Sequence, residues 1–343
     1  MPTSTPPIID SHIHLYPSSE IPSLAWCPPS HPLASQHSVT EYLAAAGPAA
    51  TPNLSGFVLI ESDRHNASSA DWTAPLQEVA WMRRLATGAP REGEGHSAAD
   101  ARLCLGLVPW TPVLLGPEKL GAYLEAAEEE AGPETWRLVK GFRYLLQDKE
   151  NGTALGEGFI EGLKVLGRRG YVFDVGVDQH RRGRVQLEEL VEMIDRAHEG
   201  VEEGEKLVFV LNHLCKPDLT ILNQTDPSFI AWRTAMFTLS KCRKTYMKLS
   251  GCFAELPDKL KERSAEDIFS AILPWLAVVV AAFGPSRLMF GSDWPVCTVG
   301  VGEESWKKWH RIVDMVCDLA GLSEQDQAML WGGTAKEAYK LEC

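Results

Sequence analysis

The sequence predicts an α/β fold, a (β/α)8 TIM barrel in one domain spanning residues 1–343. Eight short runs of apolar and β-branched residues recur along the chain, and each has the length of a strand. Segments with helical spacing lie between these runs, so one strand and one helix repeat about every 43 residues. Near-continuous hydrophobicity is typical of parallel strands buried on both faces. An open doubly wound sheet is the alternative, but no GxGxxG motif follows the first run.

The predicted elements follow from these patterns in chain order. The strands are Ile8–Leu15, Gly56–Ser62, Leu103–Trp110, Val139–Leu146, Tyr171–Val177, Leu207–Leu214, Thr245–Phe253 and Arg287–Pro295. Helices are expected between the strands eight times over, and examples with clear helical spacing are Trp72–Leu85, Lys119–Ala131, Gly158–Gly167, Leu187–His198, Phe229–Ser240 and Ala265–Phe283. Leu187, Leu190 and Ile194 illustrate the helical pattern, because their spacing of three or four residues gives one apolar face.

Two segments exceed this repeating unit. Residues 17–38 form a long loop, rich in proline and serine, directly after the first strand. Because barrel active sites are built from such loops, this segment is either a lid over the site or a surface excursion on the rim. Residues 88–101 precede the third strand, so we expect a mobile insertion at the opposite end of the barrel, with no catalytic role.

Composition excludes two classes of protein. The chain has 343 residues, a mass of 37.9 kDa, 45% hydrophobic residues and a formal net charge of −13. A chain this long and apolar can bury a large core, which excludes intrinsic disorder as its main state. The pI of about 5.3 argues against nucleic-acid binding, which normally needs a basic face. An acidic substrate stays open, because a few local cations outweigh the global charge at a site.

The sequence predicts a cytoplasmic protein with no membrane partner. Its eight cysteines are scattered without a CxxC pair, and several, such as Cys104, lie inside apolar runs. Residues 1–7 lack the basic and then apolar layout of a signal peptide. The longest apolar run, Leu276–Phe283, is too short to span a bilayer.

A His-x-His motif ends the first predicted strand. His12 and His14 point the same way because side chains alternate along a strand, and Asp10 is expected below them on that face. Two imidazoles at this spacing can chelate one divalent ion, while a carboxylate can orient a ring nitrogen. The motif therefore predicts a metal site at the carboxyl end of the barrel.

Two distant residues should join this motif. His213 closes the sixth strand and Asp293 ends the eighth. A carboxylate there is poorly solvated unless positive charge lies across the barrel mouth. In a closed barrel the eighth strand lies beside the first, so Asp293 should lie next to His12 and His14.

Other strand ends supply further pocket residues. Glu61 is a metal or substrate contact, and Arg143 offers a guanidinium suited to bidentate recognition of a carboxylate. Lys248 and Lys216 either contact substrate or pair with a carboxylate. Two carboxylates at the end of the fifth strand, Asp174 and Asp178, are predicted to bind substrate hydroxyls. Three aromatic residues are predicted to form apolar walls of the pocket: Trp110, Trp294 and Tyr144.

Four motifs together resemble the amidohydrolase superfamily, and more narrowly its amidohydrolase-2 branch of sugar-lactone and dicarboxylate lactonases. They are the His-Ile-His, His-Leu-Cys-Lys-Pro, Lys-Leu-Ser-Gly and Gly-Ser-Asp-Trp-Pro runs at His12, His213, Lys248 and Asp293. The resemblance implies that His12 and His14 are metal ligands, that His213 is a ligand or polarises the substrate, and that Asp293 is a ligand and general base.

The chain departs from the superfamily at the fifth strand. Many members carry a histidine at the end of that strand, where this chain has Asp174, and His180 follows several residues later. We expect His180 in a loop rather than at a ligand position. Metal occupancy is therefore open, and the dicarboxylate lactonases of the branch work without a metal.

The resemblance implies a metal-dependent hydrolase, a lactonase that opens a sugar lactone or a related carboxylated lactone. A divalent ion, zinc from its nitrogen and oxygen ligands, would lower the pKa of bound water to about 7. Asp293 would accept the proton, while His213, Arg143 or the metal would stabilise the oxyanion. The alternatives are a metal-dependent decarboxylase of the same superfamily and a non-catalytic ligand-binding barrel.

Overall fold

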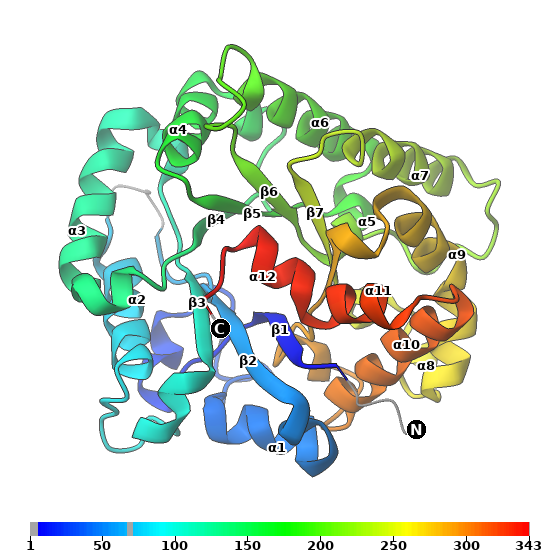
Figure 1. Cartoon of the computed structure of the whole chain (residues 1–343), viewed down its shortest axis with the longest axis horizontal. Coiled ribbons are helices and arrows are strands. Elements are labelled where there is room, and N and C mark those ends of the chain that lie inside the picture. Colours follow the sequence, from blue (N-terminus) through cyan, green and yellow to red (C-terminus); the bar gives the residue numbers. More distant parts are fainter. Residues whose placement is uncertain (1–5, 67–70, 343) are drawn as a thin grey trace.

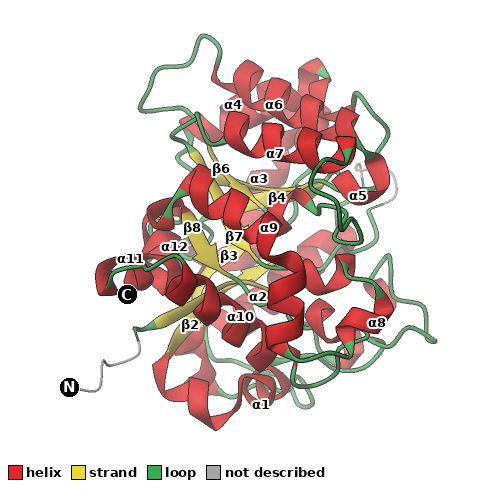
Figure 2. Ribbon diagram, turned by 90° about the vertical axis from the view of Figure 1, so that its right-hand side faces the viewer, coloured by secondary structure: helices red, strands yellow, loops and turns green. Residues whose placement is uncertain are grey.

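The computed structural model describes residues 6–66 and 71–342. Eight parallel strands follow one another around a barrel in chain order, and helices surround them (Figure 1). Figure 2 shows the same arrangement from the side, with the strands inside and the helices outside. The strands are β1 Ile8–Ile13, β2 Leu54–Ile60, β3 Cys104–Val108, β4 Gly141–Leu145, β5 Val172–Gly176, β6 Val208–Leu211, β7 Thr245–Leu249 and β8 Leu288–Phe290.

A helix follows each strand, as the alternation in the sequence predicts. The eight helices of this outer layer are α1 Val39–Ala50, α2 Thr73–Ala86, α3 Gly116–Trp136, α4 Glu157–Arg168, α6 Arg184–His198, α7 Pro227–Leu239, α9 Ala265–Phe283 and α10 Ser305–Leu319. Shorter helices are α5 Gln179–Arg182, α8 Asp258–Lys261, α11 Glu324–Ala328 and α12 Thr334–Ala338. The six helical segments named as examples from the sequence correspond to α2, α3, α4, α6, α7 and α9.

Two seams join a three-stranded sheet, β1-β2-β3, to a five-stranded sheet, β4 to β8. Parallel bridges connect β3 to β4 at Leu107 and Val139. At the other seam, Ile13 pairs with Trp294, and the backbone N–H of Asp293 donates to the carbonyl of His12 at 2.9 Å. The strands therefore form a closed ring, and the open-sheet alternative is wrong.

The amino end of the barrel is filled by the C-terminal segment. Helix α12 lies across this end (Figure 1). Its residues join the inward-facing side chains of the strands in one buried cluster: Ile9, Val58, Ile60, Val108, Val172, Val210, Met289, Ala335, Ala338, Tyr339 and Leu341. This plug leaves the carboxyl ends of the strands as the open face of the barrel.

The first strand contains an irregularity that corrects the predicted position of Asp10. Asp10 pairs with Phe57 and Ile13 with Leu59, so three residue steps on β1 oppose two on β2. This bulge turns the Asp10 carboxylate away from the two histidines and toward the helical layer. There it accepts hydrogen bonds from Tyr42, Trp306 and the backbone N–H of Ser292.

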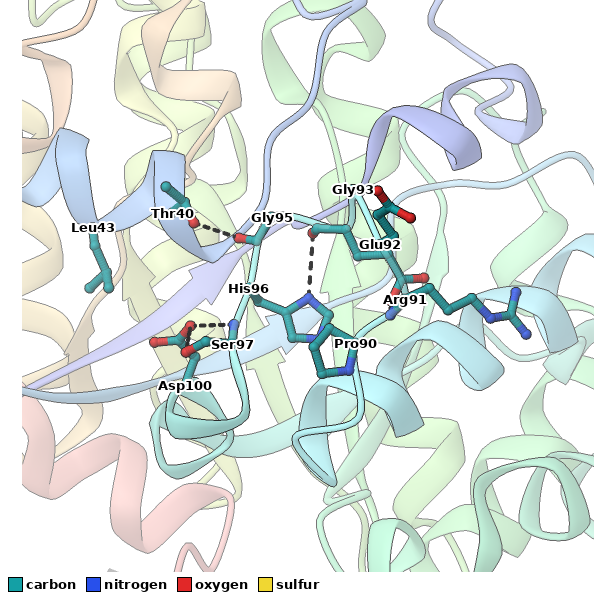
Figure 3. Close-up of a pocket in the computed structure, with 11 residues that line it drawn as sticks. Thr40, Leu43, Pro90, Arg91, Glu92, Gly93, Gly95, His96, Ser97 and Asp100 are labelled. Atoms are coloured by element: carbon teal, nitrogen blue, oxygen red, sulfur yellow. Dashed lines mark hydrogen bonds between the residues drawn. The ribbon is translucent and has the colours of Figure 1, made fainter.

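The insertion at 88–101 lies elsewhere than predicted. The carbonyl of Gly95 accepts hydrogen bonds from the backbone N–H and hydroxyl of Thr40, at the start of α1, which faces the carboxyl ends of the strands. Figure 3 shows this contact beside a shallow hollow of about 690 Å³. Glu94 is buried and bonds Arg84, which also contacts Glu20 in the 17–38 loop. The buried carboxylate thus anchors the insertion along α2 toward the catalytic face.

Helix α9 is more apolar than the sequence reasoning allowed. Its 19 residues, with mean hydropathy 1.8, satisfy the length and composition of a membrane span. In this structure one face packs into the barrel core through Ile268, Ile272, Trp275, Leu276, Val279 and Phe283. The helix is therefore part of the outer layer of the barrel.

Replacing Asp10 tests the seam between β1 and β8. Asp10→Ala leaves three buried donors without their acceptor, and each orphaned donor costs about 1–3 kcal/mol. We expect the free energy of unfolding, measured by urea denaturation, to fall by at least about 3 kcal/mol. The exposed Asp318→Ala is the matched control, expected to change stability by less than about 0.5 kcal/mol. Equal stability of the two variants would contradict this role for Asp10.

Candidate active site

A cavity of about 360 Å³ opens at the carboxyl ends of the strands. Predicted site residues from five strands line it: His14, Glu61, Arg143, His213 and Asp293. The loops that follow the strands supply most of the remaining wall: Trp26, His31, Leu33, Ser62, Asp63, Gln147, Asp148, Lys216, Ala254, Lys261, Val296 and Val299. None of these residues lines the hollow beside the 88–101 insertion.

Three imidazoles surround one carboxylate oxygen. The Nε2 atoms of His12, His14 and His213 each lie 3.7 Å from Oδ1 of Asp293. The Nε2 atoms of His12 and His14 are 3.1 Å apart. Closure of the barrel therefore brings the first, sixth and eighth strand ends together, as the sequence predicted.

Each histidine ring is fixed through its other nitrogen. Nδ1 of His14 donates to the backbone carbonyl of Glu61 at 2.8 Å, which leaves the Nε2 lone pair directed at the cluster. Nδ1 of His213 lies 2.9 Å from the Ser250 hydroxyl. Gly251 packs closely against this ring: a Cβ added at Gly251 would lie 2.4 Å from Nδ1 of His213. These contacts set the directions of the two rings.

His12 rests on a buried polar network that corrects the prediction for Asp174 and, of the two alternatives for Lys248, confirms the pairing with a carboxylate. Nζ of Lys248 lies 3.0 Å from Nδ1 of His12 and 2.6 Å from Oδ1 of Asp174. Asp174 also accepts hydrogen bonds from Asn212 and from Tyr339 of the C-terminal segment. Lys248 and Asp174 are fully buried and do not line the cavity, so they support His12 from below instead of contacting substrate.

Glu61 and Arg143 form an ion pair in the cavity wall. Nη1 of Arg143 donates to Oε1 of Glu61 at 3.0 Å, and Oε2 of Glu61 accepts the backbone N–H of Asp63. Burial raises the pKa of Glu61, and the neighbouring guanidinium offsets part of this shift. The structure therefore places Glu61 as the partner of Arg143, outside the histidine–aspartate cluster.

Strained backbone accompanies the functional side chains. Residues 213–216 have four consecutive positive φ values between 45° and 61°, and Asp293 has φ 61°. Such conformations cost free energy for residues other than glycine and are held only by strong surroundings. Here the Trp232 indole donates to the Leu214 carbonyl, and the backbone N–H of His180 donates to the Lys216 carbonyl. The turn aims His213 at the cluster.

Burial sets the protonation of the cluster. It lowers the pKa of His213 to about 3, against the attraction of Asp293, and lowers the pKa of His12 well below its ordinary value. Burial alone would raise the pKa of Asp293, but His213 and His14 hold it below the ordinary 3.8. At neutral pH, His12 and His213 are therefore uncharged and Asp293 is ionised.

The residues fit a divalent cation. One donor atom from each of His12, His213 and Asp293 lies within 4.8 Å of the other two. Two ligands with bonds of about 2.1 Å are at most about 4.2 Å apart, and the 3.7 Å separations of the His12 and His213 nitrogens from Oδ1 of Asp293 satisfy this limit. Uncharged imidazoles and a carboxylate are the donor types that zinc accepts. His14 lies beside this group and Glu61 does not belong to it.

Several other predicted residues occupy structural positions. His180 lies in α5 and pairs with Glu255 at 2.7 Å, as its predicted loop position allows. Asp178 caps α5 through the backbone N–H of Arg181. The three aromatic residues predicted as apolar walls do not line the cavity, because they pack into the core behind it: Trp110, Tyr144 and Trp294.

The 17–38 loop forms part of the cavity wall, which resolves the alternatives left open by the sequence. The Trp26 indole donates to the Ser62 carbonyl at 2.8 Å, and Leu24 pairs with Arg64 in an antiparallel bridge. Sequence reasoning did not assign roles to Trp26, His31 or Asp63. In the sequence, only the position of the 17–38 loop directly after the first strand indicated that it could line the cavity.

These features first define a class of protein: a (β/α)8 barrel enzyme with its site at the carboxyl strand ends. More specifically, the chain belongs to the amidohydrolase family, whose model matches residues 9–341. An L-rhamnono-gamma-lactonase from Scheffersomyces stipitis is 31% identical over 351 residues, covering 97% of this chain and 98% of the relative. An L-fucono-1,5-lactonase from Burkholderia multivorans is 34% identical over 210 residues, covering 60% and 65%.

Solved structures show the same fold. An amidohydrolase from Burkholderia multivorans with bound zinc has a TM-score of 0.70 at 27% identity, with coverage of 98% of this chain and 100% of that one. A dihydroxybenzoic acid decarboxylase from Polaromonas with bound manganese has a TM-score of 0.55 at 14% identity, covering 98% and 97%. The second likeness shows the fold alone.

Gly251 provides a test of the His213 geometry. Gly251→Ala places a methyl group against the imidazole, so His213 must move and kcat/KM should fall by about 100-fold, as for small displacements of catalytic groups. Gly152 is also left-handed, with φ 87° and ψ −15°, but has open space where a Cβ would lie. Gly152→Ala therefore carries a similar backbone strain without a new contact and should keep its activity. Similar activities for the two variants would show that His213 is not positioned by Gly251.

The pH profile tests the protonation states. The pKa of Asp293 lies below its ordinary 3.8, and the pKa of His213 is about 3. Asp293 therefore keeps its charge, and His213 stays uncharged, throughout the range from pH 7 to pH 5. We expect the imidazole signals of His12 and His213, followed by NMR in chelator-treated protein so that no metal-bound water contributes, to stay unchanged between pH 7 and 5. A titration of either ring with its midpoint near 6.5, the ordinary histidine value, would contradict the assignment.

Proposed function

We propose that this protein is a lactonase that opens a sugar lactone or a related carboxylated lactone by activated water. The observation that supports it most strongly is the ionised Asp293, surrounded by imidazoles at the base of the cavity. The names of two relatives point to the same reaction, since both are lactonases acting on sugar lactones.

Asp293 would act as the general base. Its Oδ1 lies 3.7 Å from each neighbouring imidazole nitrogen, longer than a hydrogen bond, so this oxygen can accept a proton from water in the cavity. Water attacks the lactone carbonyl as the proton moves to Asp293. Asp293 then returns the proton to the ring oxygen when the C–O bond breaks, which yields the hydroxy acid.

Arg143 and His213 would stabilise the tetrahedral oxyanion. The Arg143 guanidinium lines the cavity with its charge held in place by Glu61. The ring of His213 is fixed by its contact with the Ser250 hydroxyl at 2.9 Å. Donors that are already oriented lose little free energy on reorganisation, which makes such electrostatic stabilisation effective.

We further propose that His12, His14, His213 and Asp293 hold a divalent cation, with zinc as the expected metal. Such an ion would lower the pKa of the attacking water and polarise the carbonyl. The Nδ1 contacts of His14 and His213 resemble the outer contacts that orient metal-binding histidines. We place the enzyme in the cytoplasm, which suits the seven free cysteines among the described residues.

A lactone screen with Asp293→Asn tests the proposal. Wild-type protein should release acid from sugar lactones or pyrone dicarboxylates in a pH-indicator assay, with and without a chelator. Asp293→Asn cannot accept the proton, so turnover should fall by at least about 1,000-fold while the circular dichroism spectrum is retained. Asp318→Asn removes one exposed carboxylate and should keep full activity.

The outcomes separate the alternatives. Release of carbon dioxide without ring opening would indicate a decarboxylase. No turnover across the panel would favour a ligand-binding barrel. Full activity of Asp293→Asn would exclude Asp293 as the base.

A further inference from the structure

Asp63 occupies an unusual position in the cavity wall. It follows β2 by three residues and has φ 51°, a left-handed conformation that is uncommon for residues other than glycine. Its backbone N–H donates to Glu61, and its carbonyl accepts the N–H of Ala25 at 2.9 Å. The backbone is thus fixed on both sides, by the ion-paired Glu61 and by the 17–38 loop.

The carboxylate of Asp63 makes no hydrogen bond or ion pair with any residue that the structure describes, and Arg143 attracts it only from beyond contact distance. Asp63 lines the cavity and is partly buried. A strained backbone that presents an unpaired carboxylate inside a binding cavity suits a ligand with hydrogen-bond donors.

The one buried cation among the described cavity residues is already compensated. Arg143 is paired with Glu61 at 3.0 Å, whereas Lys216 donates to the neutral Gln147 and Lys261 pairs with the exposed Asp258. Asp148 adds a second carboxylate to the wall that contains Asp63. A substrate carboxylate placed beside Asp63 and Asp148 would face like charge, which costs free energy.

A substrate that carries hydroxyl groups is attracted by the same carboxylates. Hydroxyl groups donate to a carboxylate in charge-assisted hydrogen bonds, which are stronger than neutral ones. Trp26 lies in the same wall, and its indole ring is fixed by the hydrogen bond to the Ser62 carbonyl. It offers an apolar surface to one face of the substrate ring. The wall therefore matches a neutral ring that carries several hydroxyl groups.

We propose that Asp63 is a specificity-determining residue that accepts hydrogen bonds from substrate hydroxyls and selects neutral polyhydroxylated lactones over carboxylated ones. This inference rests on the proposed lactonase function and deepens it, because it chooses between the two substrate classes left open above.

Asp63→Gly and Asp63→Asn test it. Glycine and asparagine both tolerate the left-handed conformation, so the backbone is preserved while the side chain or its charge is removed. The probes are a six-carbon aldonolactone with free hydroxyls, unsubstituted δ-valerolactone and 2-pyrone-4,6-dicarboxylate. Thermal melts verify that each variant is folded, and Asp318→Asn is the charge-matched control.

We expect wild-type enzyme to prefer the aldonolactone over the dicarboxylate. Asp63→Gly should lower kcat/KM for the aldonolactone about 10- to 100-fold more than for δ-valerolactone, mainly through KM, because a hydrogen bond to a charged group is lost. Asp63→Asn should show a smaller change in the same ratio.

Three results would overturn the inference. The first is an equal loss of kcat/KM on the aldonolactone and on δ-valerolactone in Asp63→Gly. The second is that Asp63→Gly keeps the wild-type preference for the aldonolactone. The third is that wild-type enzyme opens the dicarboxylate faster than the aldonolactone. Each of them leaves the lactonase function standing. Failure of wild-type enzyme to open any of the three probes would instead contradict the proposed function itself.

Discussion

The active site depends on how Asp10 fastens the seam between the first and last strands. Its carboxylate accepts the Ser292 backbone N–H at 2.8 Å through Oδ1, and the Tyr42 hydroxyl and Trp306 indole, each at 3.0 Å, through Oδ2. Ser292 immediately precedes Asp293, so this one buried carboxylate ties the strand that carries His12 to Asp293, the proposed base. Because it also reaches α1 and α10, the same interaction connects the barrel to its helical layer. The bulge in β1 makes this arrangement geometrically compatible with inward-facing histidines.

Burial then converts this geometry into chemistry. Removed from water, His12 and His213 stay uncharged, and their lone pairs or N–H groups are available at neutral pH. Asp293 remains ionised among them because its neighbours outweigh its own desolvation. Two other carboxylates of the cavity wall differ from Asp293: Glu61 balances Arg143, whereas Asp63 has no hydrogen bond or ion pair to its carboxylate among the described residues. In the proposed function, Asp293 serves catalysis and Asp63 serves substrate selection within one cavity.

The sequence predicted much of the fold because strand burial and helical spacing are local properties. Eight apolar runs identified all eight strands, and the positions of His12, His14, His213 and Asp293 at strand ends placed them at one mouth once the barrel closed. The predictions failed where a contact with another part of the chain decides the outcome. Lys248 and Asp174 face the barrel interior, as alternation requires, but the Tyr339 hydroxyl of the C-terminal plug engages Asp174 below the cavity. The 88–101 insertion turns back along α2 because buried Glu94 needs Arg84.

The sequence by itself therefore determined the barrel, its catalytic face and the four residues of the histidine–aspartate cluster, since periodicity and strand-end position fix them. Only the tertiary structure decided the direction of Asp10, the supporting role of Lys248 and the exposure of Asp63 to the cavity. Strand alternation states which face a side chain occupies. It does not state how deep in the barrel the side chain lies, or which distant donor or acceptor satisfies it, because both depend on packing between segments far apart in the chain.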